Sequence, residues 1–188
     1  MASTAVLVAD EPVLLRRGVT SAAYFAMPET MTPHNLISGE LYRMASRRKA
    51  HQSAVGEIFR SLANLADELA GEVILSPMDC EFEDGTVLQP DLGYILPERV
   101  SIFRDYVRGV PDLVVEVISP GSRRFQREQK MAVYARFGVP EAWVVDPVAR
   151  TVTVFERGSP DGWESETTVA FGEQIPSKIV DIGAGGLA

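Results

Sequence analysis

A carboxylate stands in the middle of what the sequence predicts to be a buried strand. Glu116 lies within the apolar run at residues 113–118, which has proline on both sides. Side chains alternate along a strand, so Glu116 shares its face with the apolar residues Val114 and Ile118. An ionised carboxylate in such a place is costly unless a cation, a metal ion or several hydrogen-bond donors meet it.

Two other charged residues occupy comparable positions. Asp91 follows a proline at the point where one extended segment ends and the next begins. Lys130 lies three residues before Val133 and seven before Phe137, which places its side chain on the apolar stripe of a predicted helix. The sequence thus predicts a carboxylate on each of two successive strands and a lysine on the helix that follows.

These three residue types together indicate one kind of chemistry. Neighbouring strands lie about 5 Å apart, so carboxylates from the two can share one divalent ion. All-oxygen ligation suits Mg²⁺ or Mn²⁺, whereas Zn²⁺ prefers Cys and His. An ion held by Asp91 and Glu116 beside Lys130 outlines a site that hydrolyses phosphate esters.

Each of these residues also has a purely structural interpretation. Glu116 could lie at the rim of the sheet and pair with a surface arginine. Lys130 could bury its stem and extend its ammonium group to water. His51, on the inner side of the predicted helix 51–70, could be a hydrogen-bonded core or cap residue. Asp112 is about 13 Å along the strand from Glu116, too far to share an ion, and is interpreted as a strand-entry residue.

The sequence predicts both helices and strands, with more strands than helices. Helical periodicity and capping signals predict helices at residues 20–28, 51–70 and 123–137, with a loop or short helix at 98–108. Alternating or short apolar runs predict strands at 38–45, 72–76, 79–83, 86–89, 92–95, 113–118, 142–147, 151–156, 165–169 and 179–182. The Asp84-Gly85 pair predicts a hairpin between two of these strands.

Composition places the chain among ordinary globular proteins. Its 188 residues, 46% hydrophobic and 23% charged, predict one domain at residues 19–182, with a flexible arm at 1–18 and a flexible tail at 183–188. A net charge of −8 argues against strong non-specific binding to nucleic acid, although it allows a local basic groove. The single cysteine, Cys80, and the lack of a signal peptide or a long apolar run favour a cytoplasmic protein without a membrane span.

At these same residues the sequence resembles the PD-(D/E)xK nuclease superfamily, and within it the Uma-two type of restriction endonuclease-like proteins. The resemblance extends from about residue 21 to residue 181. Its motifs are Ser38-Gly39-Glu40-Leu41, the helix led by His51, Gln89-Pro90-Asp91-Leu92, the segment from Pro111 to Pro120, Lys130 with Tyr134-Ala135, and the segment from Gly138 to Pro147.

The resemblance implies an α/β fold with a restriction endonuclease-like mixed β-sheet flanked by helices, and additional antiparallel hairpins. It implies Asp91 and Glu116 as metal ligands and Lys130 as the catalytic lysine, moved from the strand to the following helix. Glu40 matches an acidic position near the site, and His51 matches a recurrent histidine.

The leading hypothesis is therefore a Mg²⁺- or Mn²⁺-dependent endonuclease that hydrolyses phosphodiester bonds in DNA. Basic residues that flank the site in sequence would form its rim: Arg43, Arg47, Arg48, Lys49, Arg123, Arg124 and Arg127. The alternative is a non-catalytic module that keeps the fold, binds nucleic acid or protein, and uses the charged cluster as a buried ion pair. A separate, third hypothesis is that strand edges of two copies close a homodimer.

Overall fold

The computed structural model describes residues 12–28, 30, 32–44, 49–119, 125–159, 162–183 and 187. Its helices are α1 (Ser21–Phe25), α2 (Lys49–Leu69), the 3₁₀ helix η1 (Pro97–Ile102), the π-helical segment η2 (Phe125–Lys130) and α3 (Met131–Phe137). Its strands are β1 (Val13–Arg16), β2 (His34–Ile37), β3 (Glu40–Arg43), β4 (Glu72–Leu75), β5 (Cys80–Glu83), β6 (Thr86–Leu88), β7 (Leu92–Ile95), β8 (Val107–Arg108), β9 (Leu113–Val117), β10 (Glu141–Asp146), β11 (Thr151–Ser159) and β12 (Gly162–Ala170).

The strands form two mixed sheets of six strands each. One has the order β1-β3-β2-β6-β5-β8, and the other has the order β12-β11-β10-β9-β7-β4. In the second sheet β9 and β10 run parallel, while β7 pairs with β9 in antiparallel register. The chain leaves the first sheet after β6 and enters the second at β7, so residues 89–91 join the two sheets.

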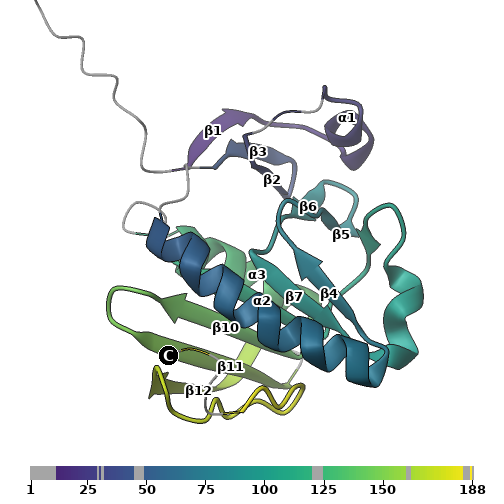
Figure 1. Cartoon of the computed structure of the whole chain (residues 1–188). Coiled ribbons are helices and arrows are strands. Elements are labelled where there is room, and N and C mark those ends of the chain that lie inside the picture. The colour runs from purple at the N-terminus through teal and green to yellow at the C-terminus, as the bar shows by residue number, and fades with distance from the viewer. Residues whose placement is uncertain are drawn as a thin grey trace, which may run out of the picture.

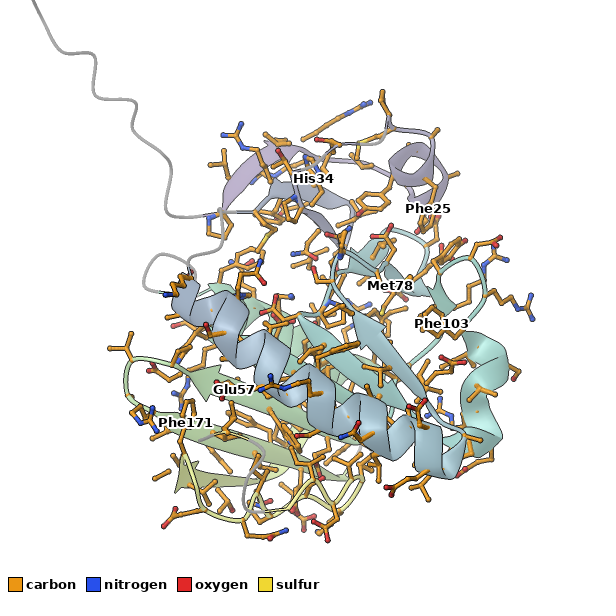
Figure 2. All side chains as sticks on the ribbon, in the orientation of Figure 1. Phe25, His34, Glu57, Met78, Phe103 and Phe171 are labelled. Atoms are coloured by element: carbon orange, nitrogen blue, oxygen red, sulfur yellow. The ribbon has the colours of Figure 1, made fainter. Side chains whose placement is uncertain are left out.

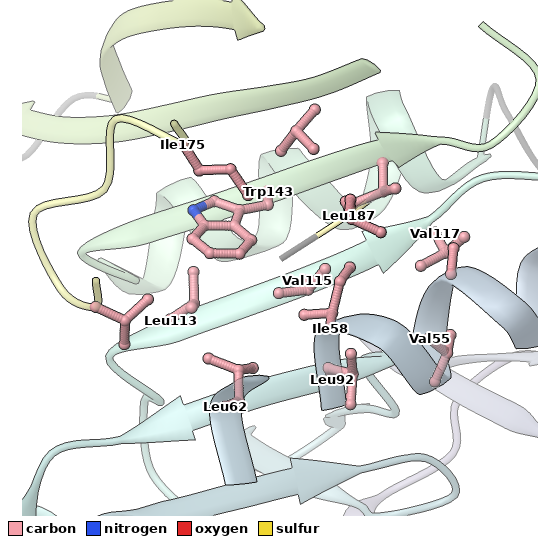
Figure 3. Packing of buried hydrophobic residues seen from close by; sticks show 14 of the residues in the cluster. Val55, Ile58, Leu62, Leu92, Leu113, Val115, Val117, Trp143, Ile175 and Leu187 are labelled. Carbon is pink, nitrogen blue, oxygen red and sulfur yellow. The ribbon is translucent and has the colours of Figure 1, made fainter. Parts of the chain in front are cut away.

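Helices α2 and α3 cover opposite faces of the second sheet (Figure 1). The side chains of Val55, Ile58 and Leu62 on α2 pack against the face that carries Leu92 and Val115 (Figure 3). Burying each such aliphatic side chain contributes about 1.5–3 kcal/mol.

The opposite face of the sheet packs against the helix that follows β9. Val114 and Ile118 lie on that face and contact Met131, Val133 and Tyr134 of α3. The alternation predicted for β9 is therefore confirmed, with its odd-numbered residues under α2 and its even-numbered residues under α3. Glu116 belongs to the second set and must face the η2–α3 helix.

Most predicted elements are present near their predicted bounds. Thr20 caps α1, its hydroxyl accepting a hydrogen bond from the Ala23 amide at 3.2 Å. Gly138 ends α3 with a left-handed φ of 79°. The fold class is confirmed as α/β with mixed sheets flanked by helices. None of the helices described combines the length and the hydrophobicity required of a transmembrane span.

At the ends of the chain and at the last predicted strand, the described residues differ from what the sequence predicts. Within the predicted flexible arm, Val13–Arg16 forms β1, which pairs with β3; residues 1–11 lie outside the described part of the chain. Within the predicted tail, Leu187 is buried in the core, and its carbonyl accepts a hydrogen bond from the Gly172 amide. Residues 179–182 pack against the core without forming a strand.

Gly93, in β7, tests how tightly the second sheet is packed. A Cβ at this position would lie 2.9 Å from the Leu113 carbonyl oxygen and 3.1 Å from Ile74 Cδ1. We expect Gly93→Ala to lower the free energy of unfolding by about 1–3 kcal/mol, because backbone on the neighbouring strand must shift. Gly56→Ala, at an exposed position on α2 with nothing within 4 Å, should instead stabilise by about 1 kcal/mol. Urea unfolding of both variants measures the contrast, and equal stabilities would contradict it.

Candidate active site

Glu116 is the centre of a buried polar cluster at the carboxyl end of β9. Its carboxylate forms an ion pair with the Lys130 ammonium group. The Tyr134 hydroxyl also donates a hydrogen bond to Glu116 Oε1 at 2.6 Å. Lys130 Nζ donates a second hydrogen bond, at 2.9 Å, to the backbone carbonyl of Gln89. One helix therefore supplies both a cation and a neutral donor to the carboxylate.

Asp91 directly precedes β7, at the point where β7 and β9 pair. Leu92, the first residue of β7, pairs with Val115, the residue before Glu116. Asp91 Oδ2 accepts a hydrogen bond from the Val117 amide at 2.8 Å and lies 3.0 Å from His51 Nε2. Two contacts thus fix the orientation of this carboxylate.

The side chains that contact the two carboxylates come from helices on opposite faces of the sheet. His51 belongs to the first turns of α2, and Lys130 and Tyr134 belong to the η2–α3 helix on the other side. Asp91 and Glu116 have no exposed surface, and Lys130 is 1% exposed. Each carboxylate therefore needs the basic or donor group that contacts it, because the unpaired charge would be costly at that depth.

The structure brings together four of the five predicted site residues: Asp91, Glu116, Lys130 and His51. Two structural alternatives are wrong. Glu116 lies in the interior and not at the sheet rim, and the Lys130 ammonium group is buried and does not reach water. Asp112 is the strand-entry residue predicted, since its carboxylate accepts hydrogen bonds from the Leu96 amide and from Arg99.

The side chain of Glu40, the fifth predicted residue, does not contact the other four in the described part of the chain. In the described part of the chain its carboxylate contacts Arg17 Nε at 2.8 Å and the Tyr42 hydroxyl. The Tyr42 hydrogen bond, followed by that of Arg17, holds the pKa of Glu40 below its usual range. The Tyr42 ring meets Phe125 edge-on, so Glu40 is linked to the start of η2 through an aromatic contact and not through the charged cluster.

The predicted basic rim is described only in part. Arg43, Lys49 and Arg127 are exposed, and Arg127 forms an ion pair with Glu166. The other four members lie outside the described residues: Arg47, Arg48, Arg123 and Arg124.

A cavity of about 900 Å³ opens beside the cluster, and both Asp91 and His51 line it. Figure 2 shows two other lining residues, Phe25 on α1 and His34 on β2. Partial burial lowers the pKa of His34 and thus favours the neutral ring. Elsewhere, burial raises the pKa of the Cys80 thiol and so favours the protonated, less nucleophilic form.

Two polar groups of the site did not stand out in the sequence. Helical spacing places Tyr134 on the apolar stripe with Val133 and Phe137, and the contact of its hydroxyl with Glu116, on the same helix face as Lys130, emerges only in the structure. The second is a network among residues that line the cavity, in which the Tyr24 hydroxyl and Gln89 Nε2 both donate to Asp79 Oδ1, at 2.8 and 3.0 Å. No local pattern in the sequence pointed to it, because α1, the β4–β5 connection and the 89–91 junction meet only in the folded chain.

The arrangement of sheets, covering helices and the polar cluster at a strand end defines a restriction endonuclease-like fold. Residues 21–184 match the Uma2 family, which is described as "Putative restriction endonuclease", and the chain belongs to this family. It is also similar to a structure described as a "putative nuclease belonging to DUF820 from Anabaena variabilis ATCC 29413", with a TM-score of 0.71 and 16% sequence identity, over 87% of this chain and 95% of that chain. At this identity the likeness shows the fold. No curated protein matches the sequence.

Proposed function

We propose that the chain is a metal-dependent endonuclease that hydrolyses phosphodiester bonds in DNA. The observation that supports this proposal is the convergence of Asp91, Glu116 and Lys130, from two strands and a helix, at one end of β9. The family to which the chain belongs is named for this class of enzyme. A chain with one such site would cut both strands of a duplex as a homodimer, which is the assembly we propose.

The donor set suits Mg²⁺ or Mn²⁺. Among the described residues no three His, Cys, Asp or Glu side chains converge into a closed metal cage. Mg²⁺ is usually held by one or two carboxylates together with water and substrate phosphate, so Asp91 and Glu116 would be sufficient. When bound, the ion would polarise the phosphate and lower the pKa of a water molecule.

The remaining residues would orient the groups that react. His51 and the Val117 amide hold Asp91 in one rotamer, and Tyr134 does the same for Glu116. The Gln89 carbonyl holds Lys130 Nζ at 2.9 Å, which fixes a positive charge beside Glu116. In the proposed reaction this ammonium group orients the attacking water or stabilises the negative charge that develops on the phosphate.

Complete burial favours a second candidate, a non-catalytic binding module. A Glu–Lys pair with at most 1% of either side chain exposed is also what a structural ion pair looks like. In such a module the cluster would specify the fold, and the chain would bind nucleic acid or protein without cleaving it. The two candidates make different predictions for variants that lack the charges of Glu116 and Lys130: the nuclease would lose DNA cleavage, whereas the binding module has no cleavage to lose.

The experiment that tests the proposal is a cleavage assay with supercoiled plasmid, linear duplex DNA, single-stranded DNA and RNA. Each substrate is incubated with the purified chain in Mg²⁺, in Mn²⁺ and in excess chelator. We expect the DNA substrates to be cut with either metal and to remain intact in chelator. Cutting that survives the chelator would contradict metal dependence, and intact DNA under every condition would favour the binding module.

A further inference from the structure

The cavity beside Asp91 is larger than a metal site requires. Its volume of about 900 Å³ falls in the range of small-molecule pockets, about 300–1,000 Å³. Its walls come from α1, β2, the first turns of α2 and the β4–β5 connection, and Asp91 and His51 also line it. A ligand in this cavity would therefore touch the proposed cleavage site.

The walls suit a flat, uncharged ring system better than a phosphate. They include the aromatic rings of Tyr24, Phe25 and His34 and the thioether of Met27, which also lines the cavity. The described lining residues include no lysine or arginine, and the two ionisable carboxylates among them are Asp79 and Asp91. A sugar–phosphate backbone requires cations, whereas a nucleobase stacks on aromatic and apolar side chains.

Gln89, which lines the cavity, carries a buried hydrogen-bond acceptor with no partner among the described residues. Gln89 is 9% exposed, and its Oε1 accepts no hydrogen bond there. Its Nε2 donates to Asp79 Oδ1 at 3.0 Å, and this contact determines which way the amide faces. A buried acceptor without a donor is costly, and a ligand that supplies an N–H group would remove that cost.

We propose that this cavity receives one unpaired nucleobase of the DNA substrate. The base would stack against the aromatic wall at Phe25, and an N–H group on its edge, such as the amino group of adenine, would donate to Gln89 Oε1. Its phosphate would then lie near Asp91. Enzymes that take a base out of the helical stack hold it in pockets of this kind. The inference rests on the proposed function for the position of the phosphate, but not for the binding of the base.

The test compares the binding of two fluorescent 20-base-pair duplexes that are identical except for one unpaired adenine. Anisotropy is measured in Ca²⁺, with the wild-type chain and with Phe25→Leu and Gln89→Met. The wild type should bind the duplex with the unpaired adenine about 10-fold more tightly, and each variant should lose most of that preference. Phe103→Leu is the matched control, because it makes the same change at a half-buried phenylalanine that does not line the cavity.

Equal affinity of the wild type for the two duplexes, or an unchanged preference in both variants, would overturn the proposal. Thermal melting of each variant shows whether it is folded, and Phe25→Leu keeps the test decisive should Gln89→Met not fold. Cleavage of the same duplexes in Mg²⁺ separates this inference from the proposed nuclease. A preference without cleavage would support the base site and contradict the nuclease, whereas cleavage without a preference would do the reverse.

Discussion

Replacing Glu116 with glutamine is expected to lower the rate of metal-dependent DNA cleavage by about 10²–10³-fold. The substitution keeps the size of the side chain and an oxygen that can accept the Tyr134 hydrogen bond, now 2.6 Å long. It removes the negative charge that would bind the cation. Asp91→Asn should have an effect of similar size, because its oxygen can still accept the Val117 amide hydrogen bond while its charge is lost.

The control for Glu116→Gln is Glu68→Gln, which makes the same chemical change at an exposed position near the end of α2. Both variants are prepared in the same way as the wild type and tested side by side on plasmid DNA. Glu68→Gln should cut at the wild-type rate. If Glu116→Gln also does so while thermal melting shows it folded, Glu116 is not a metal ligand, or a contaminating nuclease is responsible for the cutting.

Local periodicity was sufficient to predict the centre of the buried charged cluster. Strand alternation placed Glu116 between Val114 and Ile118 on one face, and helical spacing placed Lys130 on the stripe that covers that face. Both patterns depend on residues within a few positions of each other. The same reasoning, extended back one turn of α2, put His51 on the inner side, where it meets Asp91.

Contacts between distant segments could not be predicted in this way. The pairing of β1 with β3 depends on backbone hydrogen bonds between segments about 30 residues apart. The apolar run in β1 is too short to predict a strand by itself. The distribution of the strands between two sheets likewise follows from which strand edges meet. Glu40 was expected at the site from the resemblance, but the register of β3 directs its carboxylate to Arg17.

Removing the lysine should affect stability more than any other single change in the cluster. Lys130→Met is expected to lower the free energy of unfolding by about 3–5 kcal/mol, because it leaves the Glu116 carboxylate buried without its cation. Tyr134→Phe removes a neutral donor from the same carboxylate and should cost less, about 1.5–3 kcal/mol. Urea unfolding at pH 7 measures both losses.

The double variant Glu116→Gln/Lys130→Met separates the structural role of the pair from its role in catalysis. With both charges removed, we expect most of the stability lost in Lys130→Met to return, because no uncompensated ion remains in the interior. If the cluster is an active site, this stable double variant binds DNA but does not cut it. Full cleavage by the double variant would contradict the proposed nuclease centre. If the double variant is instead as unstable as Lys130→Met, the pair is not an isolated ionic contact but part of a larger network through Tyr134 and Gln89.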